Sequence, residues 1–143
     1  MYIDPRLNEI DDSLYRVALR ALITDESKVL IVKEVDGGDW WAIPGGGIDH
    51  GETVESGLFR EIKEELGVPA ELVACDFKIA HYTIGNVVNG IPRMNLYFKV
   101  KIPKEAIKKT SHIEKWGWYS KEEFLRLEMN PTYQKITLAK VIF

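Results

Sequence analysis

The sequence predicts a mixed α/β domain, in which helices pack on a mixed β-sheet. Two observations support this fold class. Strand-like and helix-like segments are interspersed along the chain, and two of the predicted strands flank an Asn-Gly pair, a strong hairpin signal. The chain has 143 residues, which suits one domain and is enough to bury a hydrophobic core. We therefore expect a single domain over residues 1–143.

Two strands are predicted to follow a polar, irregular lead-in over residues 1–13. In residues 14–24 apolar and polar side chains nearly alternate, which favours a strand with Arg16 and Arg20 on its polar side. Residues 28–35 are rich in β-branched side chains and indicate the next strand.

A loop and then a helix are expected next. Gly and Pro punctuate residues 36–47, which is typical of a loop. Residues 53–66 are predicted to be helical, because apolar side chains recur every fourth position and Gly67 supplies a C-terminal stop. These apolar positions are Val54, Leu58, Ile62 and Leu66.

The middle of the chain is predicted to form a β-hairpin. Residues 70–84 and 93–102 indicate strands, and residues 87–92 contain the Asn-Gly turn signal between them. Residues 112–120 indicate another short strand.

Two helices are predicted near the end of the chain. Ser120 and Glu123 fit a capping box at the start of a helix over residues 121–128. Pro131 is expected to stop this helix, and residues 132–143 to form the last one.

Composition excludes several classes of protein. The formal net charge of −3 argues against a nucleic-acid coat, so no nucleic-acid partner is expected, while a small phosphorylated substrate is compatible with this charge. Residues 1–13 lack the pattern of a signal peptide, and no apolar run reaches the ~18 residues of a membrane helix. Cys75 is the only cysteine, so no intrachain disulfide can form. A cytoplasmic protein with no membrane association is the expectation.

Three carboxylates share one side of the helix predicted over residues 53–66. On a helical wheel at ~100° per residue, Glu61, Glu64 and Glu65 occupy an arc next to the apolar stripe, where the helix meets the rest of the fold. Taken alone, the three acids have two interpretations. They could form a solvated face relieved by Arg60 and Lys63, or they could bind a hard divalent cation, which prefers oxygen ligands.

The residues before the helix favour the cation site. Gly46 is followed after five residues by Glu52, and after seven more by the segment REIKEELGV, residues 60–68. This spacing matches every fixed position of the Nudix box, G-x5-E-x7-R-E-U-x-E-E-x-G-U, where U is a bulky aliphatic residue. The chain therefore resembles a Nudix hydrolase, with the box over 46–68. The resemblance implies an α/β/α sandwich in which helices pack on both sides of a mixed sheet.

The resemblance also implies roles for particular residues. The Gly45 carbonyl and the carboxylates of Glu61, Glu64 and Glu65 would be the metal ligands. A pairing of Glu52 with Arg60 would brace the loop and helix and orient the neighbouring acids. His50, His81 and His112 show no metal-ligand spacing and are not expected to be ligands.

By resemblance, the activity is hydrolysis of a phosphoanhydride bond in a nucleoside diphosphate derivative. The cofactor would be one to three Mg²⁺ or Mn²⁺ ions, which would stabilise charge and activate a water for attack at phosphorus. Glu64 or Glu61 is the favoured general base, and Glu114 is an alternative acid outside the box that could equally be an ordinary surface carboxylate.

The substrate stays open among several nucleotide derivatives. Candidates are nucleoside triphosphates, ADP-ribose, dinucleoside polyphosphates and nucleotide sugars. Lys33 and Arg20 could contact phosphates, and Tyr82 could contact the substrate, as could stacking tryptophans such as Trp40 and Trp41. A homodimer is compatible with the resemblance. The alternative function is a catalytically silent Nudix-like domain that binds a nucleotide, or regulates, without cleaving it.

Overall fold

A computed structural model describes residues 5–9, 14–85 and 90–143. The strands are β1 (Arg16–Asp25), β2 (Lys28–Glu34), β3 (Gly45–Gly47), β4 (His81–Gly85), β5 (Arg93–Val100) and β6 (Ile113–Tyr119). The α-helices are α1 (Val54–Leu66), α2 (Lys121–Arg126) and α3 (Lys135–Ile142). Short 3₁₀ segments are η1 (Pro5–Glu9), η2 (Ala70–Leu72), η3 (Lys104–Ala106) and η4 (Pro131–Tyr133).

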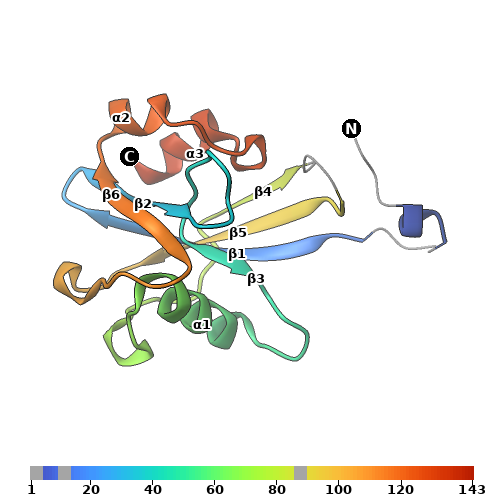
Figure 1. Cartoon of the computed structure of the whole chain (residues 1–143), viewed down its shortest axis with the longest axis horizontal. Helices are drawn as coiled ribbons and strands as arrows, with labels where there is room; N and C mark the ends of the chain where they lie inside the picture. The colour runs from blue at the N-terminus through green and yellow to red at the C-terminus, as the bar shows by residue number, and fades with distance from the viewer. Residues whose placement is uncertain (1–4, 10–13, 86–89) are drawn as a thin grey trace.

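The elements form three layers, with a mixed sheet in the middle. The strand order is β4-β5-β1-β2-β6, with β3 attached to β1, and β1 and β5 run parallel while the other pairs are antiparallel. Helix α1 lies on one side of the sheet, and α2 and α3 lie on the other (Figure 1). The predicted α/β/α sandwich with helices on both sides is confirmed.

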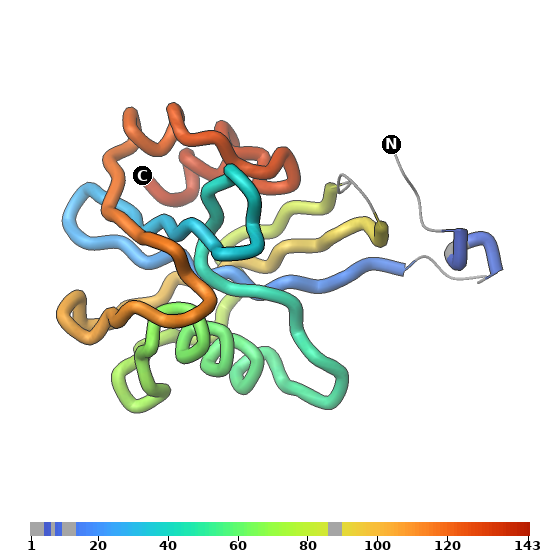
Figure 2. Tube along the Cα trace, in the orientation of Figure 1, coloured from blue at the N-terminus to red at the C-terminus, as the bar shows by residue number. Residues whose placement is uncertain are grey.

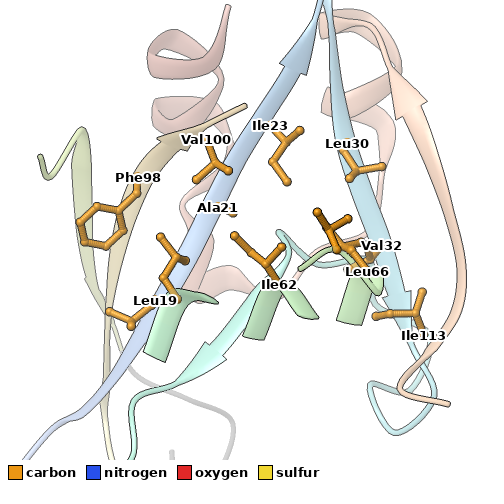
Figure 3. Close-up of a cluster of buried hydrophobic side chains, with 12 residues drawn as sticks. Leu19, Ala21, Ile23, Leu30, Val32, Ile62, Leu66, Phe98, Val100 and Ile113 are labelled. Carbon is orange, nitrogen blue, oxygen red and sulfur yellow. The ribbon is translucent and has the colours of Figure 1, made fainter. Parts of the chain in front are cut away.

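Each side of the sheet has its own hydrophobic core. On the α1 side, Leu58, Ile62 and Leu66 are buried against the sheet, and the close-up shows the side chains that this helix presents to the strands (Figure 3). On the other side, Phe124 and Leu138 of α2 and α3 pack over the sheet. Burial of such side chains contributes roughly 1.5–3 kcal/mol each. The predicted apolar stripe of α1 is therefore the one that enters the core.

Strands β1 and β2 separate soon after they meet. They pair only at Thr24↔Val29 and Asp25↔Lys28. The edge of β1 that this separation frees takes β3 as its partner, in the register Leu19↔Gly46. The prediction of a loop over residues 36–47 is therefore wrong for the last three residues, which form β3. This arrangement brings the glycine segment into the centre of the fold.

The polar side predicted for β1 is wrong at Arg20. Arg20 is buried, with 4% of its surface exposed, whereas Arg16 is exposed. Helices cover both faces of the sheet, so the middle of the strand is enclosed on both sides. The near alternation of apolar and polar side chains in residues 14–24 is therefore due in part to a buried arginine, and not to a strand face that is exposed to solvent throughout.

Helix α1 begins and ends where the sequence predicts. Thr53 and Ser56 form a reciprocal capping box at its start, with the Ser56 N–H donating to Thr53 Oγ1 at 3.1 Å. Gly67 ends it with φ of 68°, a left-handed conformation that glycine adopts without strain. Both ends are fixed by local sequence, so the acids on the helix have a definite orientation.

The strand predicted over residues 70–84 is wrong for most of its length. Only β4 is a strand; residues 70–72 form η2, and Ala74 makes a single bridge to Lys101. Phe77 has φ of 56°, which interrupts an extended chain, and its ring packs edge-on against Phe59 of α1. Packing over the helix therefore replaces sheet pairing in this segment.

The predicted hairpin is confirmed, since β4 pairs antiparallel with β5. Its predicted turn, residues 87–92, lies outside the described residues up to position 89. The capping box of Ser120 and Glu123 is also confirmed at the start of α2. Helix α2 ends at Arg126 and Pro131 opens η4, so the interval between the last two helices is longer than predicted.

The last helix begins later than predicted, because Gln134 has φ of 49° and separates η4 from α3. The loop after β2 lies beside the segment between α2 and α3 (Figure 2), where the Trp41 N–H donates to the Glu128 carbonyl at 2.8 Å. Among the described helices, none is both long and apolar enough to span a membrane.

Candidate functional site

Arg60 is the centre of a charged cluster at the start of α1. Its guanidinium donates two hydrogen bonds to the Glu52 carboxylate, at 2.7 and 2.9 Å, and one to the Gly47 carbonyl at 3.0 Å. The same group donates to Glu61 at 2.8 Å and to Glu64 at 3.2 Å. The bond to Arg60 lowers the pKa of Glu52 to about 2. The predicted contact between Glu52 and Arg60 is thus present, as a bidentate bridge between loop and helix.

Glu61 lies against the backbone of the glycine segment. A Cβ added at Gly46 would lie 2.6 Å from the Glu61 carboxylate, so only glycine leaves room for this carboxylate. Burial raises the pKa of Glu61, although its bond to Arg60 acts in the opposite direction. The carboxylate is therefore held against the backbone of Gly46 in a partly dry environment.

Glu65 is buried beside the same segment, with 6% of its surface exposed. Its Oε2 accepts a hydrogen bond from the Gly45 N–H at 2.9 Å. Burial and the nearby charge of Glu34 raise the pKa of Glu65 well above its ordinary value. Without added positive charge, the site disfavours the ionised form of this acid.

Arg20 holds the other side of the glycine segment. Its Nη1 donates to the carbonyls of Ile43 and Gly45, at 3.1 and 3.2 Å, and its Nε donates to Asn95 Oδ1 at 3.1 Å. Asn95 in turn donates to Thr83 Oγ1 at 3.2 Å. The guanidinium of Arg20 is thus directed at protein groups, and it fixes the Gly45 carbonyl that the sequence predicts as a ligand.

The remaining predicted acids lie further out. Glu64 is exposed on α1, and Glu114 is exposed on β6, where it makes no side-chain hydrogen bond or ion pair with a described residue. Within the described ranges, no three His, Cys, Asp or Glu side chains lie close enough to share one ion. Arg60 draws Glu61 and Glu64 toward itself, while the Gly45 N–H holds Glu65.

Glu34 is a member of the site that sequence reasoning missed. It ends β2, and its Oε1 lies 4.0 Å from Arg20 Nη1. Its charge is also one of the causes of the raised pKa of Glu65. An acid at the end of a strand, next to the loop that leads to the glycine segment, was an available signal. Asn95 was a second one, because it is a polar residue inside an otherwise apolar strand.

A cavity of about 150 Å³ adjoins these groups on the α2 and α3 side of the sheet. It is lined by Arg20, Glu34, Gly37, Trp40, Trp41, Ala42, Arg93, Asn130 and Tyr133. Its volume is below the roughly 300–1,000 Å³ of pockets that enclose whole small-molecule ligands, so it accommodates only part of a nucleotide. Aromatic, cationic and amide groups around one cavity are suited to a base or a phosphate.

Of two residues predicted to contact the substrate, one lies near the cavity and the other does not. Lys33 lies near the cavity, with its Nζ 5.8 Å from the centre of the Trp41 ring. Tyr82 is 61% exposed on β4. It alternates with Thr83, which bonds into the network on the cavity side, so Tyr82 projects from the opposite face. The structure does not bring Tyr82 to the cavity.

The donor chemistry of the site fits a hard divalent cation. The carboxylates of Glu61 and Glu65 lie against the short glycine segment that carries the Gly45 carbonyl. Glu64 lies one turn along from Glu61 on α1. Carbonyl and carboxylate oxygens are the ligands that Mg²⁺ prefers. Burial raises the pKa values of Glu61 and Glu65, so an adjacent cation would stabilise the ionised forms of both acids.

Comparison with known proteins gives one family. A protein-family model with the description NUDIX domain matches residues 14–139, which is most of the chain. The match includes all the described site residues.

Curated relatives are similar over part of their length. An RNA pyrophosphohydrolase from Campylobacter jejuni subsp. jejuni serotype O:23/36 is 41% identical in an alignment of 66 residues, with a coverage of 42% of this chain and 42% of that protein. An RNA pyrophosphohydrolase from Saccharophagus degradans is 34% identical over 85 residues, 59% of this chain and 48% of that protein. The matched segment thus spans less than half of these relatives.

Solved structures share the fold. The MutT protein from Methanosarcina mazei Go1 superposes with a TM-score of 0.75 at 20% identity, covering 91% of this chain and 94% of that one. At this identity the likeness concerns the arrangement of helices and strands.

Proposed function

The chain belongs to the NUDIX family, and from this premise we propose that it is a divalent-metal-dependent hydrolase of phosphoanhydride bonds in nucleotide derivatives. One observation carries the proposal. The carboxylates of Glu61 and Glu65 are held against the backbone of Gly45 and Gly46, at positions where burial raises the pKa of both acids. A bound cation at this place would stabilise the ionised forms of both acids.

The proposed cofactor is Mg²⁺ or Mn²⁺, in one to three ions. The proposed ligands are the Gly45 carbonyl, Glu61, Glu64 and Glu65. When bound, the ions would neutralise phosphate oxygens, stabilise the charge that develops in the transition state and activate a water for in-line attack at phosphorus. Glu64 would turn from Arg60 toward the ions by side-chain rotation, since 43% of its side chain is exposed, whereas Glu61 already lies against the glycine segment.

The protein groups around these acids would keep them in position. Arg20 holds the Gly45 carbonyl, and the bridge between Glu52 and Arg60 fixes the loop to the first turns of α1. Such outer contacts orient ligands and are typically worth a factor of about 10–100 in metal affinity or activity.

Glu61 or Glu64 would accept the proton of the attacking water. Glu61 is supported by burial, which raises its pKa toward the range in which a general base is efficient. Glu64 is supported by its exposed position, where a water can reach it. Glu114 stays an alternative, at an exposed position on β6.

The candidate substrates share a phosphoanhydride linked to a nucleoside. They are nucleoside triphosphates, ADP-ribose, dinucleoside polyphosphates and nucleotide sugars. The names of the curated relatives add an RNA with a 5′-polyphosphate end, because RNA carries a phosphoanhydride only there. The free face of Trp40 at the cavity would stack on a base, since no described ring or cation contacts it.

A hydrolysis screen tests the proposal. Purified protein is incubated with each substrate class in Mg²⁺, in Mn²⁺ and in excess chelator, and the released phosphate or pyrophosphate is measured. We expect turnover of at least one class with metal and none with chelator. Turnover that persists in chelator would contradict metal dependence.

The silent binding domain is the alternative. It predicts metal-dependent nucleotide binding by calorimetry with no product from any class. All the acids of the box are present, and the contacts that orient them are formed, which favours the enzyme.

A further inference from the structure

Arg93 is a partly buried cation to whose guanidinium no described residue is hydrogen-bonded or ion-paired. It begins β5 and lines the cavity beside Trp40, Trp41 and Tyr133. Its Nε is enclosed by protein and makes no hydrogen bond, and the described residues provide no ion pair to its guanidinium. Buried nitrogens of this kind are nearly always hydrogen-bonded, so one that is not calls for a missing partner.

A second arginine, for which the described part of the chain provides no ion pair, lies next to Arg93. Arg16 on β1 is its direct partner in the parallel register, so both side chains leave the sheet on the same face. The Arg16 guanidinium packs against Gly47, and none of the described carboxylates forms an ion pair with it. Burial lowers the pKa of Arg93, and the positive charges of Arg20 and Arg16 act in the same direction, while Tyr133 and Glu34 act in the opposite one.

The position of the two arginines links the cavity to the acidic site. Gly47 touches Arg16 on one side, and its carbonyl accepts a hydrogen bond from Arg60 on the other. Gly45 and Gly46, two and one residues earlier, contact Glu65 and Glu61. The glycine segment thus has the acids at one end and Arg16 at the other, and Arg93 is the neighbour of Arg16 on β5.

We propose that Arg93, together with Arg16, binds a second phosphate group of the substrate, outside the anhydride that is cleaved. This inference rests on the proposed function and narrows its substrate class to nucleotides that carry an additional phosphate near the scissile bond. Two adjacent cations call for negative charge, which a neutral base edge does not supply. A guanidinium matches phosphate in a bidentate geometry and is weakly hydrated, so it suits a partly buried subsite.

Two sources of this phosphate share the same chemistry. It belongs either to the polyphosphate chain itself, as in a triphosphate, or to the phosphodiester that follows a 5′-terminal nucleotide. Kinetics separates them. If the Arg93→Met variant raises KM for both ATP and a 5′-triphosphorylated dinucleotide, the polyphosphate is the source; if KM rises for the dinucleotide alone, the phosphodiester is.

The direct test measures binding without catalysis. Inorganic tripolyphosphate is titrated into the metal-free protein by calorimetry, with wild type, Arg93→Met, Arg93→Lys and the control Arg126→Met, which removes an exposed arginine on α2. Charge-assisted hydrogen bonds contribute strongly to affinity. We therefore expect Arg93→Met to raise the Kd for tripolyphosphate about tenfold or more, and Arg93→Lys to raise it by less. The Kd of the control should change by less than about twofold, as for an exposed charge.

Thermal unfolding distinguishes a binding role from a structural one. Removing an unpaired, partly buried cation should leave the Tm unchanged or raise it. The proposal would be overturned by an unchanged tripolyphosphate Kd in Arg93→Met together with an unchanged KM for the 5′-triphosphorylated dinucleotide. A lower Tm with equally weakened binding of adenosine, which has no phosphate, would also overturn it. If Arg93→Met fails to fold, Arg16→Met at the exposed neighbour gives the same test.

The inference and the proposed function can fail separately. If wild type hydrolyses no substrate but binds tripolyphosphate through Arg93, the enzyme assignment fails and the subsite stands. If hydrolysis proceeds and neither Kd nor KM depends on Arg93, the subsite fails and the enzyme stands.

Discussion

The guanidinium of Arg60 joins Glu52 to Glu61. Its Nε lies 2.7 Å from Glu52 Oε2, and its Nη1 lies 2.8 Å from Glu61 Oε1. One side chain thus fixes the loop that precedes α1 and, at the same time, a carboxylate that we propose as a metal ligand.

Replacing Arg60 by Lys should lower kcat/KM by about 10–100-fold, because lysine keeps the charge but cannot reach both acids with a planar fork. Steady-state kinetics at saturating Mg²⁺ would measure the loss. The Lys63→Gln variant is the control, since Lys63 is exposed on the same helix. Wild-type activity in Arg60→Lys would contradict a positioning role.

Replacing Glu65 by Gln should abolish turnover without loss of fold. The amide oxygen can still accept the Gly45 N–H, and glutamine carries no charge to bury. Because burial raises the pKa of Glu65, its ionisation destabilises the metal-free fold as the pH rises above the ordinary carboxyl range.

We therefore expect an unchanged or higher Tm in chelator at neutral pH, and an activity loss beyond the roughly 10–100-fold typical of outer contacts. Thermal melts and turnover of the same samples would check both. Glu64→Gln should likewise nearly abolish turnover, and full activity in both variants would rule out the proposed metal ligands.

The contact of Glu52 with Arg60 should make stability depend on pH. The pKa of Glu52 is lowered from 4.5 to about 2 in the folded protein, chiefly by the hydrogen bond from Arg60. A lowered pKa stabilises the fold above the unfolded value, and this contribution is lost as the pH falls through the folded one.

The stability difference between wild type and Glu52→Gln should thus be constant above about pH 5 and shrink toward pH 2, in urea unfolding at a series of pH values. Glu55→Gln, which removes an exposed carboxylate of α1 that makes no contact with Arg60, serves as the control. A difference that stays constant across the acid range would refute the assignment of the lowered pKa to this contact.

Gly45 and Gly51 offer a matched pair of glycines with positive φ, 139° and 86°. A Cβ at Gly45 would collide with the Leu19 carbonyl on β1, whereas a Cβ at Gly51 meets no atom within 4 Å. Gly51→Ala should lower the free energy of unfolding by about 1 kcal/mol from backbone strain alone.

Gly45→Ala should lower it by about 2 kcal/mol or more, because the pairing of β1 with β3 must shift as well. It should also reduce activity, since the same shift moves the Gly45 carbonyl. Chemical denaturation of both variants gives the comparison. Equal losses in the two would show that the close approach to Leu19 is not a constraint.

The sequence by itself determined the layers of the fold and the acidic helix. Periodicity and caps are local, so Val54–Leu66 and its ends at Thr53 and Gly67 could be predicted from neighbouring residues alone. The box spacing likewise predicted that Glu52 meets Arg60, because a loop and the first turns of its helix bring these positions together.

Only the tertiary structure decided which distant groups complete the site. The burial of Arg20 depends on helices from the far end of the chain, and Asn95, which bonds to it, lies 75 residues away. Glu34 and Arg93 reach the site because β1 and β2 separate and β5 lies parallel to β1, which no local pattern encodes. Long-range pairing sets these contacts, so the sequence determined the acids of the box and the fold determined the groups around them.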